Sequence, residues 1–346
     1  MVQISKRLSI INQAQFVDKL DYFFKKYLCK QPKSSYIIIM KICHLFLITL
    51  GIIIVSTANA TVFPLPYENN DVIGKLQTIT VPKGADITDL GQKYSIGYLE
   101  FLESNPLVNL QNLWTGEKLV LPTEYILPPV PRRGIVINLA ELRMYYYPKK
   151  SDVVYIFPIG IGRSHTPTPL MKSKIIAKHK DPTWIPTEDT HEEARELGIM
   201  LPDRILPGPQ NPLGKYSIRL SQHTYLIHGT NRPEGVGIKS SGGCIRMYPD
   251  DIEQLFHLVH VRMPVNIIDQ PFKIGWKNNV LYLESHVPVE LKRKKSKDQL
   301  EPLVDVLKNE IYMQHAKIDW QRAINVAEQQ TGIPKPVGRR YPQAGI

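Results

Sequence analysis

Cysteine is scarce in this chain of 346 residues, which contains only Cys29, Cys43 and Cys244. We expect the first two to lie in an N-terminal segment that is removed or left behind when the protein is exported. The exported protein would then carry one thiol and no internal disulfide. Because a lone cysteine is a liability in an oxidising compartment unless it has a task, Cys244 is the first candidate for chemistry.

Signals for metal and for nucleic acid are also lacking. No second cysteine and no His-x-x-x-His or His-Glu-x-x-His spacing accompanies Cys244, so the sequence predicts no metal site there. Basic residues are not interleaved with aromatic ones, so we expect no nucleic-acid partner. The net charge is +11 for the whole chain and +5 for residues 61–346, a mild excess that suits an acidic polymer or a membrane surface.

The N-terminal region has the pattern of a signal peptide. A short positive start, an apolar run and an Ala-x-Ala ending follow one another within residues 40–60. We therefore expect cleavage after Ala60 and a periplasmic protein. Residues 1–39 are interpreted as an over-extended start or a cytoplasmic segment. The alternative is an uncleaved inner-membrane anchor of about 20 residues, with the bulk of the protein facing the periplasm.

Residues 77–122 predict a small module of the order strand, helix, helix, strand. Asn105-Pro106 follows the second helix, and the module ends in a Gly-Glu-x-Leu-x-Leu-Pro pattern at residues 116–122. This βααβ segment resembles a LysM module. The resemblance implies binding to the N-acetylglucosamine-containing backbone of peptidoglycan or chitin, and the alternative is a spacer without a ligand. Residues 123–133 are interpreted as a Pro-rich, semi-stiff linker.

Residues 134–285 have a strand-rich texture, broken often by glycine and proline. This texture predicts a mostly β catalytic domain of the β-sandwich or barrel type. The expected strands are 134–139, 142–147, 153–160, 216–220 and 224–227, with 265–268 and 280–283 closing the sheet, and the expected helices are 191–200 and 250–258. The tail, residues 287–346, has a basic run at 292–297 and two helical patterns at 300–312 and 317–330. We expect a basic, helical tail of unknown role.

The candidate chemistry is centred on Cys244 and His228, which lie sixteen positions apart. A cysteine attacks as the thiolate and needs a base within reach, and a strand that ends at His228 followed by a glycine-rich loop would bring the two together. The Gly243 and Cys244 amides are candidates for an oxyanion hole, and Arg246 for binding a substrate carboxylate bidentately. From chemistry alone, a buried apolar cysteine and a core histidine remain an alternative.

The segments around this pair resemble the L,D-transpeptidase catalytic domain, also called the YkuD domain. The central signature is His228-Gly229-Thr230-Asn231 with Ser241-x-Gly243-Cys244-Ile245-Arg246. The resemblance runs over residues 130–285 and includes Pro158–Gly162, Thr166–Pro169, Pro182–Trp184 and Asn211–Gly214. An export signal, a LysM-like module and this domain together are similar to the ErfK/YbiS/YcfS/YnhG type of Gram-negative bacteria.

The resemblance implies a peptidoglycan L,D-transpeptidase. Cys244 would attack the diaminopimelate carbonyl of a tetrapeptide stem and release D-alanine, with His228 as proton acceptor and donor and the Gly229 carbonyl orienting the imidazole. Arg246, Ser241, Trp184 and Thr230 would bind substrate. The acyl group would pass to a lysine of an outer-membrane lipoprotein or β-barrel protein, or to diaminopimelate for 3–3 cross-links. No cofactor is implied, and carbapenems are expected to acylate the thiol.

Two alternatives stay open beside this hypothesis. A hydrolase on the same scaffold, an L,D-carboxypeptidase or endopeptidase, needs the same two side chains. A non-catalytic wall-binding protein would use only the LysM-like module. A penicillin-binding enzyme is disfavoured because no Ser-x-x-Lys occurs with its partner motifs. Many family members have histidine where this chain has Gly242, so a contribution of that side chain is in doubt.

Overall fold

The computed structural model describes residues 62–67, 70–222, 224–287 and 296–340, which all belong to the unit Asn59–Ile346. The expected signal peptide, residues 40–60, and the segment 1–39 lie outside the described residues, as does most of the basic run 292–297. None of the described helices is both long and apolar enough to cross a membrane.

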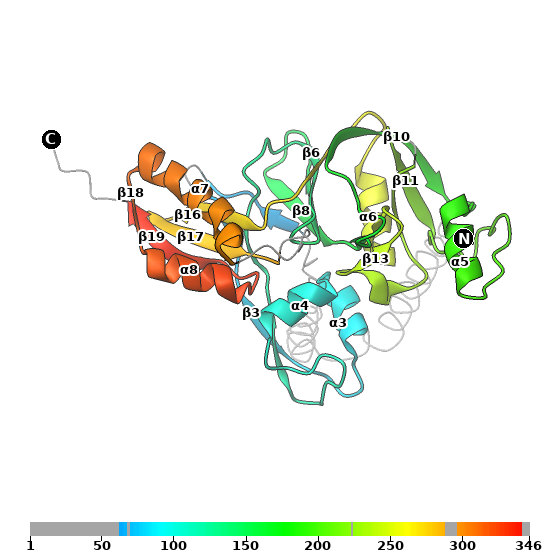
Figure 1. Ribbon diagram of the computed structural model, residues 1–346, viewed down its shortest axis with the longest axis horizontal. Helices are drawn as coiled ribbons and strands as arrows, with labels where there is room; N and C mark the ends of the chain where they lie inside the picture. The colour runs from blue at the N-terminus through cyan, green and yellow to red at the C-terminus, as the bar shows by residue number, and fades with distance from the viewer. Residues whose placement is uncertain (1–61, 68–69, 223, 288–295, 341–346) are drawn as a thin grey trace, which may run out of the picture. The chain divides into compact units, whose positions relative to one another are not determined.

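A curled nine-stranded sheet forms the main domain and confirms the mostly β prediction (Figure 1). Its strand order is β1-β8-β7-β6-β15-β10-β11-β12-β14, with parallel pairs only at β6–β15 and β12–β14. The bounds are β1 (Val62–Pro64), β8 (Val153–Pro158), β7 (Arg143–Tyr147), β6 (Gly134–Asn138), β15 (Pro264–Ile268), β10 (Met171–Lys180), β11 (Tyr216–Leu220), β12 (Leu226–His228) and β14 (Ile245–Arg246).

The sheet buries one apolar face against helix α6 (Pro249–Leu258). Pro249 suits the first helical turn because its fixed φ matches a helix and its missing N–H needs no partner there. Ile252 and Leu255 of this helix are fully buried in the same cluster as Ile227 and Ile245. The helix therefore covers the part of the sheet where β12 and β14 lie.

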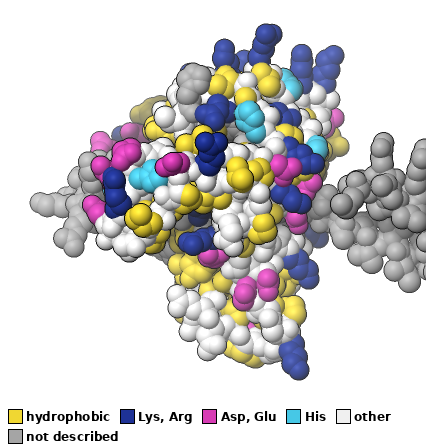
Figure 2. All heavy atoms as spheres, turned by 90° about the vertical axis from the view of Figure 1, so that its right-hand side faces the viewer, with side chains coloured by type: hydrophobic (Ala, Val, Ile, Leu, Met, Phe, Trp, Pro, Cys, Tyr) yellow, Lys and Arg dark blue, Asp and Glu magenta, His cyan; other side chains and the backbone are white. Residues whose placement is uncertain are grey.

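The longest strand, β10, was not predicted from the sequence. It pairs with β15 on one side and β11 on the other, so it joins the two halves of the sheet. Its exposed side chains include Lys172, Lys174 and Lys180. Figure 2 views the molecule from the right-hand side of Figure 1 and shows lysine and arginine side chains on the upper part of that face.

The LysM-like segment has the predicted order of elements. Strand β3 (Gln77–Thr80) pairs with β4 (Lys118–Leu121), and helices α3 (Ile87–Tyr94) and α4 (Tyr98–Ser104) lie between them in sequence. Asn105 explains the Asn-Pro motif: its side chain donates to the Val120 carbonyl at 3.0 Å and accepts from the Val120 amide at 2.7 Å. The end of α4 is thereby fixed to β4.

The interpretation of residues 123–133 as a linker was wrong for its first part. Residues Glu124–Ile126 form strand β5, which pairs with β2 (Val72–Gly74). Tyr125 and Leu127 are buried in a cluster with Ile73 and Tyr145, so this segment is part of a core. Apolar side chains, which the proline content obscured, hold it in place.

The tail is not only helical, and Val280–Leu283 does not close the catalytic sheet. Strands β16 (Phe272–Lys277), β17 (Val280–Ser285), β19 (Lys335–Arg340) and β18 (Ala316–Ile318) form a separate four-stranded antiparallel sheet. Helices α7 (Ser296–Gln314) and α8 (Trp320–Gln329) pack against it. The expected second helix starts later because Asp319 caps α8, its carboxylate accepting from the Arg322 amide.

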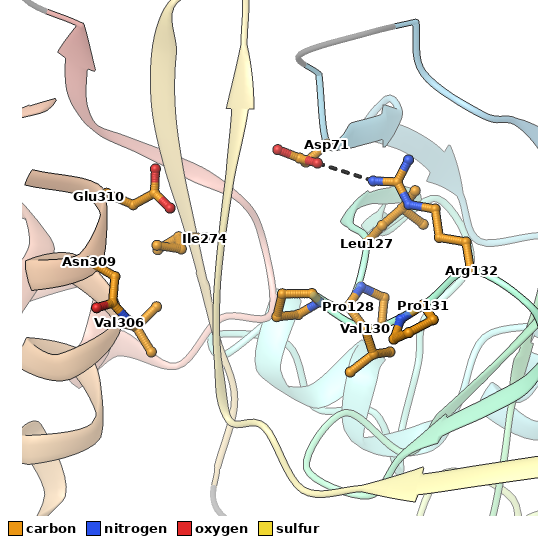
Figure 3. A pocket seen from close by; sticks show the side chains of 11 residues that line it. Asp71, Leu127, Pro128, Val130, Pro131, Arg132, Ile274, Val306, Asn309 and Glu310 are labelled. Atoms are coloured by element: carbon orange, nitrogen blue, oxygen red, sulfur yellow. Dashed lines mark hydrogen bonds and ion pairs between the residues drawn. The ribbon is translucent and has the colours of Figure 1, made fainter. Parts of the chain in front are cut away.

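A cavity of about 510 Å³ lies between residues 127–132 and this C-terminal unit (Figure 3). An ion pair of 3.1 Å between Asp71 and Arg132 borders it on one side, and Ile274 and Val306 border it on the other. None of the predicted site residues lines this cavity. It belongs to the packing of the C-terminal unit rather than to the candidate chemistry.

Candidate active site

His228 ends strand β12, and Cys244 immediately precedes β14, the parallel strand beside it. The register pairs Ile227 with Ile245 and His228 with Arg246. Both isoleucines are fully buried in the core, so the alternate residues point to the opposite face. If this register is extended by one residue, Cys244 lies opposite Leu226. Leu226 is two residues before His228, so both residues of β12 face the same side of the sheet. The fold thus brings together two side chains that are sixteen positions apart in sequence.

The His228 imidazole is buried and oriented. Its Nδ1 lies 2.6 Å from the Gly229 carbonyl oxygen, which can only accept, so Nδ1 carries the proton and Nε2 the free lone pair. Burial, and next the positive charge of Arg246, lower the pKa of His228 to about 4. At neutral pH the ring is therefore uncharged and able to accept a proton at Nε2.

The Cys244 thiol is half-buried, with Sγ 3.6 Å from the Thr224 carbonyl oxygen. Burial raises the pKa of Cys244, and the Leu226 amide and the charges of Arg219 and Arg246 partly offset this rise. The two shifts have the same sense: burial favours the uncharged imidazole of His228 and the uncharged thiol of Cys244.

The turn before the nucleophile is held by its own hydrogen bonds. The Ser241 hydroxyl donates to the Cys244 carbonyl at 2.5 Å and accepts from the Gly243 amide at 3.2 Å. Gly243 has a φ of 107°, a backbone conformation that residues with a side chain rarely adopt, so the turn requires glycine there. Ser241 is therefore bonded within the turn. The Gly243 amide already has a partner, so an oxyanion role for it requires an exchange of this bond.

The motifs between residues 158 and 169 support this turn from the outside. Strand β9 (Ile161–Gly162) pairs with β13 (Lys239–Ser241). The Thr168 hydroxyl donates to the Gly243 carbonyl at 2.8 Å and accepts from the Gly162 amide at 2.9 Å. Sequence reasoning quoted these residues as part of a resemblance but gave them no role. Their short spacing with glycine and proline was the signal that a tight loop lies there.

Arg246 lies on the catalytic face beside the pair. Its backbone pairs with Gly160, and its Nη1 donates to the Ser240 hydroxyl at 3.1 Å. A Cβ at Gly235 would come within 2.2 Å of Nη1, so the guanidinium lies directly against that backbone. The Ser240 hydroxyl therefore holds one edge of the guanidinium.

Thr230 and Trp184 were both predicted to bind substrate, and the structure places them in two different loops. The Thr230 hydroxyl is buried and closes a turn, accepting from the Arg232 amide at 2.9 Å and donating to its carbonyl at 3.1 Å. Trp184 pairs through its backbone with Ile205 in the long excursion between β10 and β11. Helix α5 (Glu188–Glu196) belongs to the same excursion, and Glu193 binds Arg163 at 2.5 Å, close to the nucleophile turn.

Position 242 is open. Gly242 is exposed, and a Cβ built there meets no atom within 4 Å. A histidine, which many family members have at this position, would have room here. The structure therefore gives no steric reason for glycine at 242.

Within the described part of the chain, one cluster has the spacing of metal ligands: Glu141, Glu284 and His286. Two cations already neutralise it. Lys273 binds Glu141 at 2.8 Å and Glu284 at 3.1 Å, and Arg143 binds Glu284 at 2.6 Å. The donor set is that of a buried ion-pair network, which fits a metal ion poorly.

Comparisons with known proteins identify the family. Residues 132–267 match the family model of the YkuD L,D-transpeptidase catalytic domain. The chain is 36% identical over 283 residues to the probable L,D-transpeptidase ErfK/SrfK of Escherichia coli (strain K12), covering 80% of this chain and 91% of that protein. It is 38% identical over 255 residues to the probable L,D-transpeptidase YbiS of the same strain, covering 72% and 83%.

Among solved structures, the catalytic domain from the E. faecium L,D-transpeptidase is similar at 25% identity and a TM-score of 0.32, over 41% of this chain and 100% of that one. The sequence matches define the class as that of cysteine-dependent transpeptidases. The chain belongs to the L,D-transpeptidase family, which acts on peptidoglycan peptides. The matched residues stop at 267, and β16 and β17 beyond them belong to the C-terminal sheet.

Proposed function

We propose that this protein is a periplasmic peptidoglycan L,D-transpeptidase that uses Cys244 as nucleophile and His228 as base. The observation that carries the proposal is the pair itself: a half-buried thiol and a neutral imidazole on one face of adjacent strands, with the imidazole fixed by the Gly229 carbonyl. In this pair a backbone carbonyl, rather than a carboxylate, orients the neutral histidine. This weaker support is enough for a thiol, because a thiol gives up its proton more readily than a hydroxyl does.

In the first half-reaction His228 Nε2 takes the thiol proton as Sγ attacks the carbonyl of the stem diaminopimelate. The tetrahedral intermediate then breaks its bond to the terminal D-alanine. His228 returns the proton to the leaving amine, and a thioester to Cys244 remains. The Gly243 and Cys244 amides stabilise the oxyanion, which requires the Gly243 amide to leave Ser241 as the substrate enters.

In the second half-reaction an amine attacks the thioester. His228 takes a proton from the attacking nitrogen and returns it to the departing sulfur, so the product is an amide and the thiol is restored. The acceptor is a lysine of an outer-membrane lipoprotein or β-barrel protein, or a diaminopimelate side chain. Arg246 attracts the anionic groups of the stem, because its charge lies on the same face as Cys244.

The experiment is acylation by a carbapenem, measured as the mass of the intact protein, residues 61–346. Wild type should gain one drug molecule, and Cys244→Ala should gain none. A folded wild-type protein without an adduct would overturn the assignment of Cys244. Incubation with tetrapeptide stems and mass spectrometry of the products then separates transfer to an amine from hydrolysis.

A further inference from the structure

The excursion between β10 and β11, residues 181–215, exposes large apolar side chains to solvent. Backbone pairing of Trp184 with Ile205 fixes its base, and alternation along these two short segments points Ile185 and Leu206 to the same side. Exposed apolar side chains gathered in one segment are typical of surfaces that bind a partner. Five such side chains, with exposed fractions between 51% and 92%, belong to the excursion: Ile185, Leu197, Ile199, Met200 and Leu206.

Helix α5 lies in this excursion, beyond the ends of β10 and β11 (Figure 1). Only Ala194 of its nine residues is buried, and five residues are acidic against one arginine. Residues three and four apart lie in one row on a helix, so Glu188, Glu192 and Arg195 form a row. Arg195 pairs with both carboxylates of this row, at 2.9 and 3.8 Å. The row is therefore neutralised within the helix.

The neighbouring row of α5, Asp189, Glu193 and Glu196, stays negative. The hydrogen bond from Arg163 lowers the pKa of Glu193, so this carboxylate is ionised and paired. Asp189 and Glu196 are exposed, and neither forms an ion pair with any residue that the structure describes. Residues 61–346 carry a net charge of +5, so this acidic row is a local exception in a basic protein.

This acidic row lies on the side of α5 that is connected to the nucleophile. Glu193 binds Arg163 at 2.5 Å, and the Arg163 amide donates to the Ser241 carbonyl at 2.9 Å. The Ser241 hydroxyl in turn donates to the Cys244 carbonyl at 2.5 Å. A partner seated on the excursion would therefore lie beside the turn that carries the thiol.

The second half-reaction indicates which partner fits. A lysine amine is protonated at neutral pH before it attacks, so a protein acceptor approaches with a cationic group and with the side chains around it. Cationic and apolar side chains would match the acidic row and the exposed apolar residues. A diaminopimelate amine carries a carboxylate on the same carbon, which the acidic row would repel.

We propose that the excursion docks the polypeptide that accepts the acyl group, through a segment with cationic and apolar side chains around the reactive lysine. The acceptor surface consists of the five exposed apolar side chains together with Asp189 and Glu196. The inference rests on the proposed function, because only a transferase needs an acceptor. It selects a protein lysine over diaminopimelate as that acceptor.

Peptide binding measured without turnover tests the inference. In Cys244→Ala protein, fluorescence anisotropy compares a labelled peptide that contains one lysine, two arginines and two leucines with a matched peptide in which glutamine replaces each arginine. We expect the cationic peptide to bind roughly ten-fold more tightly, because its charge complements the acidic row. Asp189→Asn combined with Glu196→Gln should cut this preference by at least about three-fold.

A matched pair of substitutions separates contact from overall charge. Glu188→Gln combined with Glu192→Gln removes the same two charges from the same helix, but in the row that Arg195 neutralises. At about 0.15 M salt, where distant charges are screened, it should keep the preference within about two-fold. Leu197→Ser combined with Met200→Ser should weaken the binding of both peptides by about three-fold or more, because it removes apolar contact.

Equal binding of the two peptides, no binding of either, or an equal loss of preference in the two charge variants would overturn the inference. Sedimentation of the wild-type protein as a dimer that Met200→Ser dissociates would also overturn it, because a second copy of the chain would then cover the apolar residues. The proposed function is judged separately, by carbapenem acylation of the wild-type thiol. Failure of acylation with a preserved peptide preference would reject the chemistry and keep the peptide-binding surface.

Discussion

Arg143 lies at the centre of a buried ionic network that joins three parts of the chain, and replacing it by alanine tests how those parts hold together. Its guanidinium, 1% exposed, binds Glu100 of the module at 2.9 Å, Glu141 at 3.1 Å and Glu284 of the C-terminal sheet at 2.6 Å. It also lies over the Tyr125 ring, 4.5 Å from the centroid. The substitution leaves three buried carboxylates with fewer partners.

The expected cost follows from this loss. Removing one member of a buried ion pair costs about 3–5 kcal/mol, because the partner charge stays buried without compensation. Lys273 still binds Glu141 and Glu284, which limits the cost there, but Glu100 loses its only ion pair within the described part of the chain. At about 2–4 °C per kcal/mol for a protein of this size, the melting temperature should fall by about 6–20 °C.

The assay is thermal unfolding of Arg143→Ala beside Arg132→Ala. Arg132 pairs with Asp71 at the same 3.1 Å as Arg143 with Glu141, but both side chains are 36% exposed, so its loss should cost at most about 1 kcal/mol. Limited proteolysis should also release fragments at the module boundary in Arg143→Ala first. Equal melting temperatures for the two variants would refute the view that the network holds the parts together.

Four further predictions follow from the site and its surroundings. Because the pKa of His228 is lowered to about 4, carbapenem acylation should stay level down to about pH 5, and an acid limb centred near 6.5 would contradict a buried neutral base. Gly242→His should fold and acylate at a near wild-type rate, since no atom lies within 4 Å of the Cβ position; a clear fall in melting temperature would show an unseen constraint. Burial lowers the pKa of His286, but hydrogen bonds to Glu103 and Glu284 outweigh burial and raise this pKa to about 9. The contribution of His286 to the free energy of unfolding is therefore complete below about pH 6.5 and is lost as the pH rises through about 9. His286→Gln should flatten this loss of stability with pH, measured by urea titrations at several pH values. Deleting residues 77–122 should impair acylation as well as sacculus binding, because Val236 becomes exposed, and full acylation by the deletion variant would show an independent module.

The candidate pair Cys244 and His228 could be proposed from the sequence because a specific motif and the one cysteine expected to remain after export point to the same residues. The hydrogen bond from His228 to the Gly229 carbonyl is local and was expected. The bond that occupies the Gly243 amide was not, because it depends on the rotamer of Ser241, which no pattern encodes. The role of Thr168 was out of reach because one of its two partners, the Gly243 carbonyl, lies 75 residues away in the sequence.

The wrong predictions about the fold share one cause: the local sequence of a strand does not determine which strand it pairs with. Strand β10 alternates lysine with residues of mixed polarity, a weak signal that pairing with β11 and β15 overrides. Strand β17 has a clear apolar alternation, but its partner β19 comes 50 residues later, so the sheet it joins could not be predicted. By contrast, α3 and α6 have capping signals and periodicity within their own residues.

The contacts between the LysM-like module and the catalytic domain change what the module contributes. A tethered sugar-binding module would raise only the local concentration of enzyme on the wall. A module whose Gly97 backbone lies against Gly237, and whose α4 supplies Glu100 to a network shared with β7 and β17, also fixes the back of the active site. The short turn Pro233–Gly235 lies beside this junction, and its Gly235 backbone lies against the Arg246 guanidinium. We therefore expect activity on soluble stems to depend on the joined parts rather than on the catalytic sheet alone.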